Sequence, residues 1–126
     1  MKELTKAEEQ VMQHIWKLEK AFLKDIVAAF PDPKPAYTTI STVIRVLVKK
    51  GFLGFNTYSK VHEYYPLISR QDYFKKYFKR VIGSFFNGSL SGFASYLTDM
   101  EGVSVEELEE MNDLISQKIK KIRDDE

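Results

Sequence analysis

Short hydroxyl side chains and one guanidinium gather within residues 36–51 of this sequence, where they can hydrogen-bond to another molecule. A threonine hydroxyl can bond a phosphate or the edge of a base, and its methyl can contact the methyl of thymine. The chemistry that such a cluster favours is therefore recognition of nucleic acid. The residues concerned are Thr38, Thr39, Ser41, Thr42 and Arg45.

A helix would hold these side chains on one surface. Ile40, Val43, Ile44 and Leu47 fall at i, i+3, i+4 and i+7, which predicts one apolar stripe that docks on a core. The polar residues fall away from the centre of this stripe. Because Thr and Ser are mediocre residues inside a helix, their exposed clustering indicates a functional surface. A β-prone segment or an ordinary packed helix remains an alternative for this stretch.

The predicted recognition helix begins at Tyr37, and its N-terminal turn can attract phosphate. Gly51 predicts its end, because glycine commonly follows the last helical turn. Lys49 and Lys50 stand just before that glycine, where positive charge suits the negative end of the helix dipole.

Two further helices are predicted before the recognition helix. Thr5 and Glu8 form a capping box that opens a helix over about residues 6–19. A second helix, about Leu23–Phe30, ends at the proline cluster Pro31–Pro35, since proline cannot continue a helix. Two helices joined by a turn and braced by a third form a helix-turn-helix arrangement. The expected core of the first helix is Val11, Met12, Ile15 and Trp16, with His14 at the boundary.

Residues 52–67 predict a β-hairpin. Aromatic and β-branched residues flank a polar Ser59-Lys60 pair, as in two strands joined by a tight turn. Three helices followed by a hairpin predict a winged helix, whose tip, with Lys60, would lie along the phosphate backbone. We interpret His62 as a cross-strand surface residue rather than a base contact.

The second half of the chain predicts three helices. A helix that begins near Ser69 carries a wide aromatic face and ends at Asn87-Gly88, and a segment with Leu90 and Phe93 follows. The last helix starts with a capping box, Ser104 to Glu107, and has a coiled-coil seam containing Asn112. This region is small and apolar, which favours dimerisation over folding alone; packing on its own winged helix is the alternative. The predicted dimerisation residues are Tyr73, Tyr77, Phe78, Val81, Phe85, Leu90, Phe93, Leu97, Leu108, Ile115 and Ile119.

We therefore predict a mainly α fold with a small β-hairpin. A winged helix-turn-helix DNA-binding domain would span residues 1–68, and a helical dimerisation region would span residues 69–126. Composition supports a globular chain, with 44% hydrophobic and 29% charged residues.

Composition also excludes several classes of protein. The 126 residues include no cysteine and two distant histidines, so neither a metal site nor a cofactor is expected. No Gly-rich phosphate loop or Gly-x-Ser-x-Gly elbow appears, so we expect no enzymatic activity. No apolar run approaches the roughly 20 residues of a membrane span, and we expect a cytoplasmic protein without membrane insertion.

The net charge of +1 conceals an uneven distribution. Residues 1–80 contain 15 Lys and Arg against 8 Asp and Glu, whereas residues 81–126 contain 4 against 10. The halves thus carry +7 and −6, which suggests that a polyanion meets only the first. Such blocks also arise as ordinary solvated faces.

The sequence resembles the penicillinase-repressor (BlaI/MecI) family of winged-helix regulators over nearly its whole length. The most specific resemblance lies in the segment around the predicted recognition helix, and the C-terminal motifs are looser. The matching segments are Leu4–Glu9, Val11-Met12, Ile15-Trp16, Asp25–Val27, Ala36–Thr42, Leu47–Leu53, Tyr64–Leu67, Phe86–Ser89 and Glu106–Met111.

The resemblance implies a homodimeric repressor on a two-fold symmetric double-stranded DNA operator, in a β-lactam-resistance-like or peptidase-linked operon. It implies DNA contacts by Tyr37, Thr38, Thr39, Thr42 and Lys60. The sequence departs from the family pattern at Ser41 and Val46, so the operator sequence does not transfer.

The resemblance also implies a membrane sensor protease system as a partner. In relatives that respond to β-lactams, such a system cuts an Asn-Phe bond in the dimerisation region, and an ungapped alignment places Tyr96-Leu97 there. Copper-responsive relatives have a cysteine-rich tail that this chain lacks. An alternative to the repressor is a protein-interaction module that keeps the winged-helix scaffold without reading DNA.

Overall fold

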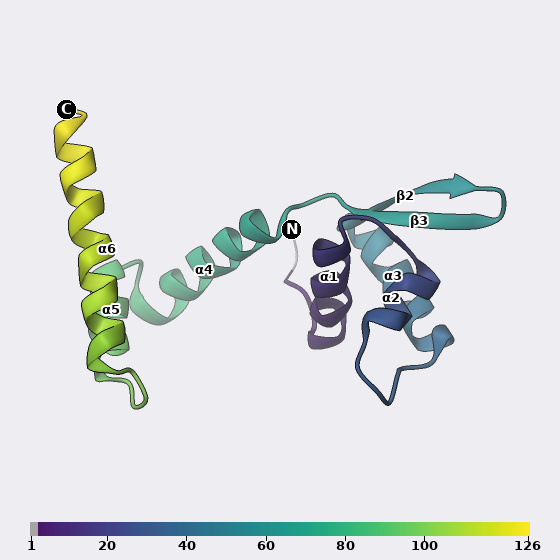
Figure 1. Cartoon of the computed structure of the whole chain (residues 1–126), viewed down its shortest axis with the longest axis horizontal. Coiled ribbons are helices and arrows are strands. Elements are labelled where there is room, and N and C mark those ends of the chain that lie inside the picture. The colour runs from purple at the N-terminus through teal and green to yellow at the C-terminus, as the bar shows by residue number, and fades with distance from the viewer. Residues whose placement is uncertain (1–2) are drawn as a thin grey trace. The chain divides into compact units, whose positions relative to one another are not determined.

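The computed structural model describes residues 3–126 and confirms a mainly helical fold with a small antiparallel sheet (Figure 1). The chain divides into two compact units, residues 1–78 and 79–126. None of the described helices is both long and apolar enough to cross a membrane. The elements are α1 (Lys6–Leu18), β1 (Ala21–Phe22), α2 (Leu23–Ala29), α3 (Tyr37–Lys50), β2 (Leu53–Tyr58), β3 (Val61–Pro66), α4 (Arg70–Phe86), α5 (Leu90–Asp99) and α6 (Val105–Asp124).

The order of elements in the first unit is that of a winged helix. Helix α1 begins with the predicted capping box: the Glu8 amide donates to Thr5 Oγ1 at 3.2 Å, and the Thr5 amide donates to Glu8 Oε1 at 2.9 Å. Two amides that lack helical partners are thereby satisfied. Helix α2 ends one residue before the predicted Phe30, ahead of the proline cluster.

The sheet contains one strand more than the predicted hairpin. Strands β2 and β3 pair from Leu53 opposite Pro66 to Tyr58 opposite Val61, so Ser59 and Lys60 alone form the turn. Ser59 adopts a φ of 58°, as tight two-residue turns require. Strand β1 pairs with β3 on its other edge, which gives the order β1-β3-β2. The sequence did not predict β1, because two residues show no periodicity.

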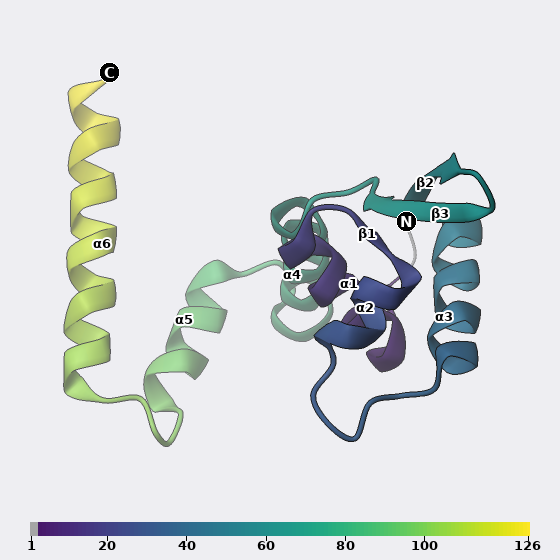
Figure 2. The same ribbon diagram turned by 45° about the vertical axis from the view of Figure 1, so that its right-hand side comes forward.

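The core of the first unit forms where α3 meets α1, α2 and the sheet. Ile40, Ile44 and Leu47 are buried along one side of α3, as the apolar stripe predicted. Gly51 then ends the helix with a φ of 86°, and its amide reaches the carbonyls of Leu47 and Val48. This left-handed conformation turns the chain directly into β2. Helix α3 runs from the proline loop to the hairpin, with its opposite side facing away from the other helices (Figure 2).

The beginning of α4 packs on the winged helix. Trp16 Nε1 donates to the Ile68 carbonyl at 2.9 Å, and the Leu4 amide donates to the Tyr73 hydroxyl at 2.8 Å. The Tyr73 ring also lies edge-on to Phe52, with centroids 5.8 Å apart. These contacts hold the first turn of α4 against the core, which the aromatic periodicity of this helix did not indicate.

The second unit contains the end of α4 with α5 and α6. Helix α4 ends at Phe86, as the Asn-Gly pair predicted, and Asn87 and Gly88 both take positive φ. Ser89 caps α5 by accepting from the Gly92 amide, and Ser104 with Glu107 forms the predicted capping box of α6. No residue of α5 or α6 is fully buried within the described chain.

Candidate nucleic-acid interface

The outward side of α3 carries a continuous polar stripe. Thr38, Thr42, Arg45 and Lys49 are spaced by four, three and four residues, so they lie on one face opposite the buried Ile40 side. All four side chains are exposed. Of the other predicted contact residues on this helix, Tyr37 and Thr39 are exposed and Ser41 is half-buried.

The N-terminus of α3 has no side-chain cap. The residue before the helix is Ala36, which has no side-chain oxygen to accept from the amides of the first turn. Uncapped amides and the positive end of the helix dipole together favour an anion. Tyr37, Thr38 and Thr39 are the first three residues of the helix, and all three are exposed.

Thr42 makes a hydrogen bond that restricts how it can contact a ligand. Its hydroxyl donates to the Thr38 carbonyl at 2.9 Å, one turn earlier in the helix. The proton of this hydroxyl is thereby committed to the helix backbone. The methyl group and the remaining oxygen lone pair are the parts of Thr42 that can meet a base.

The hairpin supplies a second exposed surface. Lys60 stands at its tip between the exposed Tyr58 and Val61. Thr57 and His62 face each other across the strands, with Thr57 Oγ1 2.9 Å from His62 Nδ1. The His62 ring also lies 4.3 Å from that of Phe55. These contacts confirm the interpretation of His62 as a cross-strand residue.

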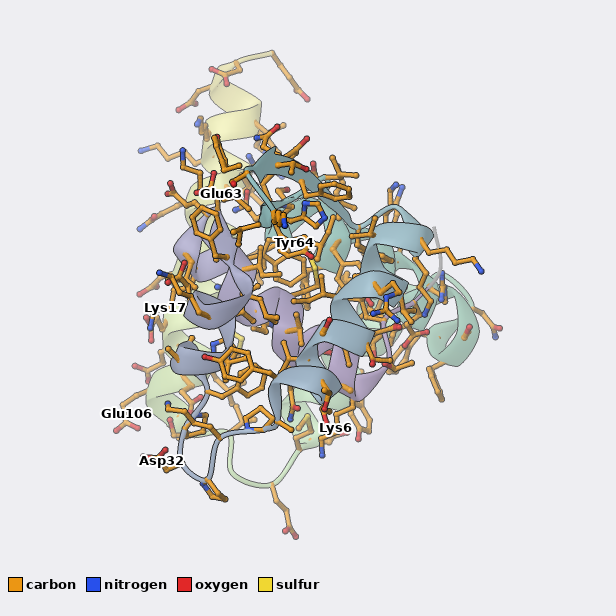
Figure 3. The ribbon with its side chains drawn as sticks, turned by 90° about the vertical axis from the view of Figure 1, so that its right-hand side faces the viewer. Lys6, Lys17, Asp32, Glu63, Tyr64 and Glu106 are labelled. Carbon is orange, nitrogen blue, oxygen red and sulfur yellow. The ribbon has the colours of Figure 1, made fainter. Side chains whose placement is uncertain are left out.

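Arg45 links α3 electrostatically to the hairpin. Burial raises the pKa of the Tyr64 phenol, and the positive charge of Arg45 opposes that rise. The side chain of Tyr64, on β3, lies between the sheet and the helices below it (Figure 3). Asp32 lies on the loop at the far end of α2. The sheet thus places an aromatic group near the guanidinium that the polar stripe carries.

Lys50 does not belong to this surface, although it adjoins Lys49 in sequence. Its Nζ lies 2.8 Å from both carboxylate oxygens of Glu8. Glu8 is only 5% exposed. Burial raises the pKa of Glu8, but the hydrogen bond and charge of Lys50, with the Thr5 bonds, outweigh it and lower the pKa overall. Nothing in the local sequence indicated this pair, because its members lie 42 positions apart.

The predicted dimerisation residues divide into two groups. Phe85 is the most exposed at 77%, and Tyr77, Leu90, Ile115 and Ile119 are also exposed. The half-buried group consists of Tyr73, Phe78, Val81, Phe93, Leu97 and Leu108. Tyr73 packs on the core of its own winged helix. Within residues 3–126, no group of three or more His, Asp and Glu side chains is arranged to hold a metal ion.

Comparisons with known proteins extend across both units. Residues 4–117 match the family model described as penicillinase repressor. The methicillin resistance regulatory protein MecI of Staphylococcus aureus (strain N315) is 29% identical over 117 residues, which cover 92% of this chain and 95% of MecI. The penicillinase repressor of Bacillus licheniformis is 25% identical over 116 residues, which cover 91% of each chain. The solution structure of the DNA binding domain of the repressor BlaI covers 57% of this chain and 93% of its own, with 29% identity and a TM-score of 0.49.

Proposed function

Because this chain belongs to the penicillinase repressor family, a family of transcriptional repressors, we propose that it represses transcription by binding DNA. In this proposal α3 enters the major groove of a two-fold symmetric operator, and the chain acts as a homodimer. Repression follows from occupancy, because the bound dimer covers the promoter.

The observation that carries the proposal is the outward face of α3. Thr38, Thr42 and Arg45 form a row of short or planar polar groups, with no long acidic side chain between them. Such a row can approach base edges closely, and each good base contact is worth about 1–3 kcal/mol of discrimination. Lys49 and Lys60 would add phosphate contacts, which position the protein and make its affinity salt-dependent.

Homodimerisation is supported by the apolar surface of the second unit. Large side chains of α4, α5 and α6 stay in solvent when the chain is considered alone, and exposed apolar clusters of this kind mark interaction sites. Two copies would bury them together and present two α3 helices to two half-sites. The exposed side chains of this unit include Phe85, Leu90, Ile115, Ile119 and Ile122.

Release by a membrane sensor protease is the part of the proposal that rests on the family resemblance alone. The corresponding bond joins Tyr96, which is exposed, to Leu97, which is half-buried, within α5. Cleavage there would divide the apolar surface that dimerisation requires. A β-lactam-resistance-like or peptidase-linked operon is proposed as the target on the same basis.

In vitro selection from random double-stranded DNA at about physiological salt tests the proposal. We expect enrichment of an inverted repeat, because a two-fold dimer reads the same sequence twice in opposite directions. A folded protein that enriches no sequence would refute base reading and favour an interaction module. Enrichment of a single, non-repeated half-site would retain base reading but contradict the symmetric dimer.

A further inference from the structure

Helix α6 is one long helix (Figure 1). Most of its charges are separated by sign along its length. Its first half carries Glu106, Glu107, Glu109, Glu110 and Asp113, and its second half carries Lys118, Lys120, Lys121 and Arg123, with Asp124 as the last helical residue. The first half of this helix is therefore acidic, and the second half is mainly basic.

The helix dipole explains only part of this separation. Acidic residues in the first turn and basic residues in the last turn are favourable, and these are Glu106, Glu107, Lys121 and Arg123. The dipole effect falls off beyond the terminal turns. The same order of sign nevertheless continues through the interior, with Glu109, Glu110 and Asp113 before Lys118 and Lys120.

The separation also weakens the isolated helix. Like charges stand four residues apart at Glu106 and Glu110, and again at Glu109 and Asp113. Like-charge pairs at this spacing repel, whereas an alternating arrangement would supply intrahelical ion pairs. No basic residue stands three or four positions from any acidic residue of the first half, so this half lacks intrahelical pairs that opposite charges from another chain can supply.

The apolar seam of α6 lies open between these charges. Ile115 is 59% exposed, Ile119 is 45% exposed and Ile122 is 52% exposed. The seam residues Val105, Leu108, Asn112, Ile115, Ile119 and Ile122 alternate spacings of three and four, as in a two-helix coiled coil.

We propose that α6 pairs antiparallel with α6 of a second copy, in one register set by its charges and by Asn112. In this register Val105 faces the partner's Ile122, and Leu108 faces the partner's Ile119. Each acidic half then lies beside a basic half. The inference deepens the proposed homodimer and rests on it.

Asn112 distinguishes this register from shifted ones. With Asn112 facing the partner's Ile115, the two asparagines lie in adjacent layers on either side of the two-fold axis, where their amides can hydrogen-bond. A shift by one heptad in one direction sets each Asn112 against the partner's Ile122 and places the two asparagines about 15 Å apart along the axis. The opposite shift sets each Asn112 against the partner's Leu108 and places Glu107 beside the partner's Asp113. A single polar residue in an apolar seam commonly fixes register in this way. A parallel pair would instead place acid beside acid along half the helix.

Cysteine cross-linking tests the arrangement, since the natural chain contains no cysteine. Ile115→Cys places the two thiols about 5 Å apart along the helix axis in the proposed register, and Ile122→Cys places them about 25 Å apart. We expect a short bismaleimide to link Ile115→Cys into covalent dimers and to leave Ile122→Cys unlinked. Ser116→Cys and Arg123→Cys form a second pair that leaves the seam intact.

Each outcome supports or overturns the inference. Equal linking at both positions would indicate a parallel pair, and linking at position 122 alone would indicate a shifted antiparallel register; either result would refute the proposed register. A dimer by light scattering with no linking at any position would place the interface elsewhere and would also refute it. A monomeric unaltered chain would refute the homodimer of the proposed function itself.

Discussion

Thr42 offers the sharpest test of how α3 reads DNA. Its hydroxyl already donates to the Thr38 carbonyl at 2.9 Å, so we expect the methyl group to make the base contact. Thr42→Ser removes the methyl and keeps the hydroxyl. Thr42→Val keeps the methyl and replaces the hydroxyl with a second methyl of similar size. The exposed position of Thr42 means that neither change creates a cavity in the core.

The expected effect follows from the area that the methyl buries. One buried methyl is worth about 0.8 kcal/mol. A symmetric dimer loses it twice, about 1.6 kcal/mol in total, which corresponds to about a 15-fold increase in Kd. Thr42→Ser should therefore bind the selected operator about 15-fold more weakly, and Thr42→Val should bind it nearly as well as the unaltered chain.

Fluorescence anisotropy on the selected operator and on a scrambled duplex, at one salt concentration, measures both kinds of binding. Thr42→Ser should weaken binding to the operator and leave binding to the scrambled duplex unchanged. The reasoning is refuted if Thr42→Val loses the operator and Thr42→Ser retains it, since the hydroxyl would then read the base. Equal losses on both duplexes would assign Thr42 to backbone contact or packing.

Four further predictions concern stability, its dependence on pH and phosphate contact. Lys50→Met should lower the free energy of unfolding, measured by urea denaturation, by about 3–5 kcal/mol, because it leaves the Glu8 carboxylate buried and without its ion-pair partner. The double variant Glu8→Gln with Lys50→Met should recover part of this loss. Failure to recover any of it would contradict the pairing argument. Because the folded pKa of Glu8 is below its ordinary 4.5, the pair's contribution is complete above that value and is lost as pH falls through the folded pKa. A pH-independent difference between Lys50→Met and the unaltered chain from pH 7 to 3 would refute this. Lys60→Ala should weaken binding to the operator and to scrambled DNA alike, and should reduce the slope of log affinity against log salt concentration by about one per subunit. An unchanged slope would show that Lys60 makes no phosphate contact. Gly51→Ala should lower the free energy of unfolding by about 1 kcal/mol, because the φ of Gly51 is 86°. Gly83→Ala should raise it, because Gly83 lies inside α4 and no atom lies within 4 Å of the new Cβ. Thermal unfolding that shifts in the same direction for both variants would contradict the backbone argument.

Local sequence patterns determined most of the secondary structure. The capping boxes at Thr5 and Ser104 opened helices where predicted, and Gly51 closed α3. The spacing of Ile40, Ile44 and Leu47 identified the buried side of α3, and hence which residues remain outside. These features depend on residues within one or two turns of each other, so the sequence alone specifies them.

Contacts between distant segments were decided only by the tertiary structure. The Glu8–Lys50 pair removes one lysine from the basic surface, although Lys49 and Lys50 are equivalent by local pattern. Strand β1 exists because β3 offers it an edge, and Tyr73 joins the core because Leu4 and Phe52 lie within its reach. Each depends on how separate elements pack, and packing brings together residues whose spacing along the chain carries no periodic signal.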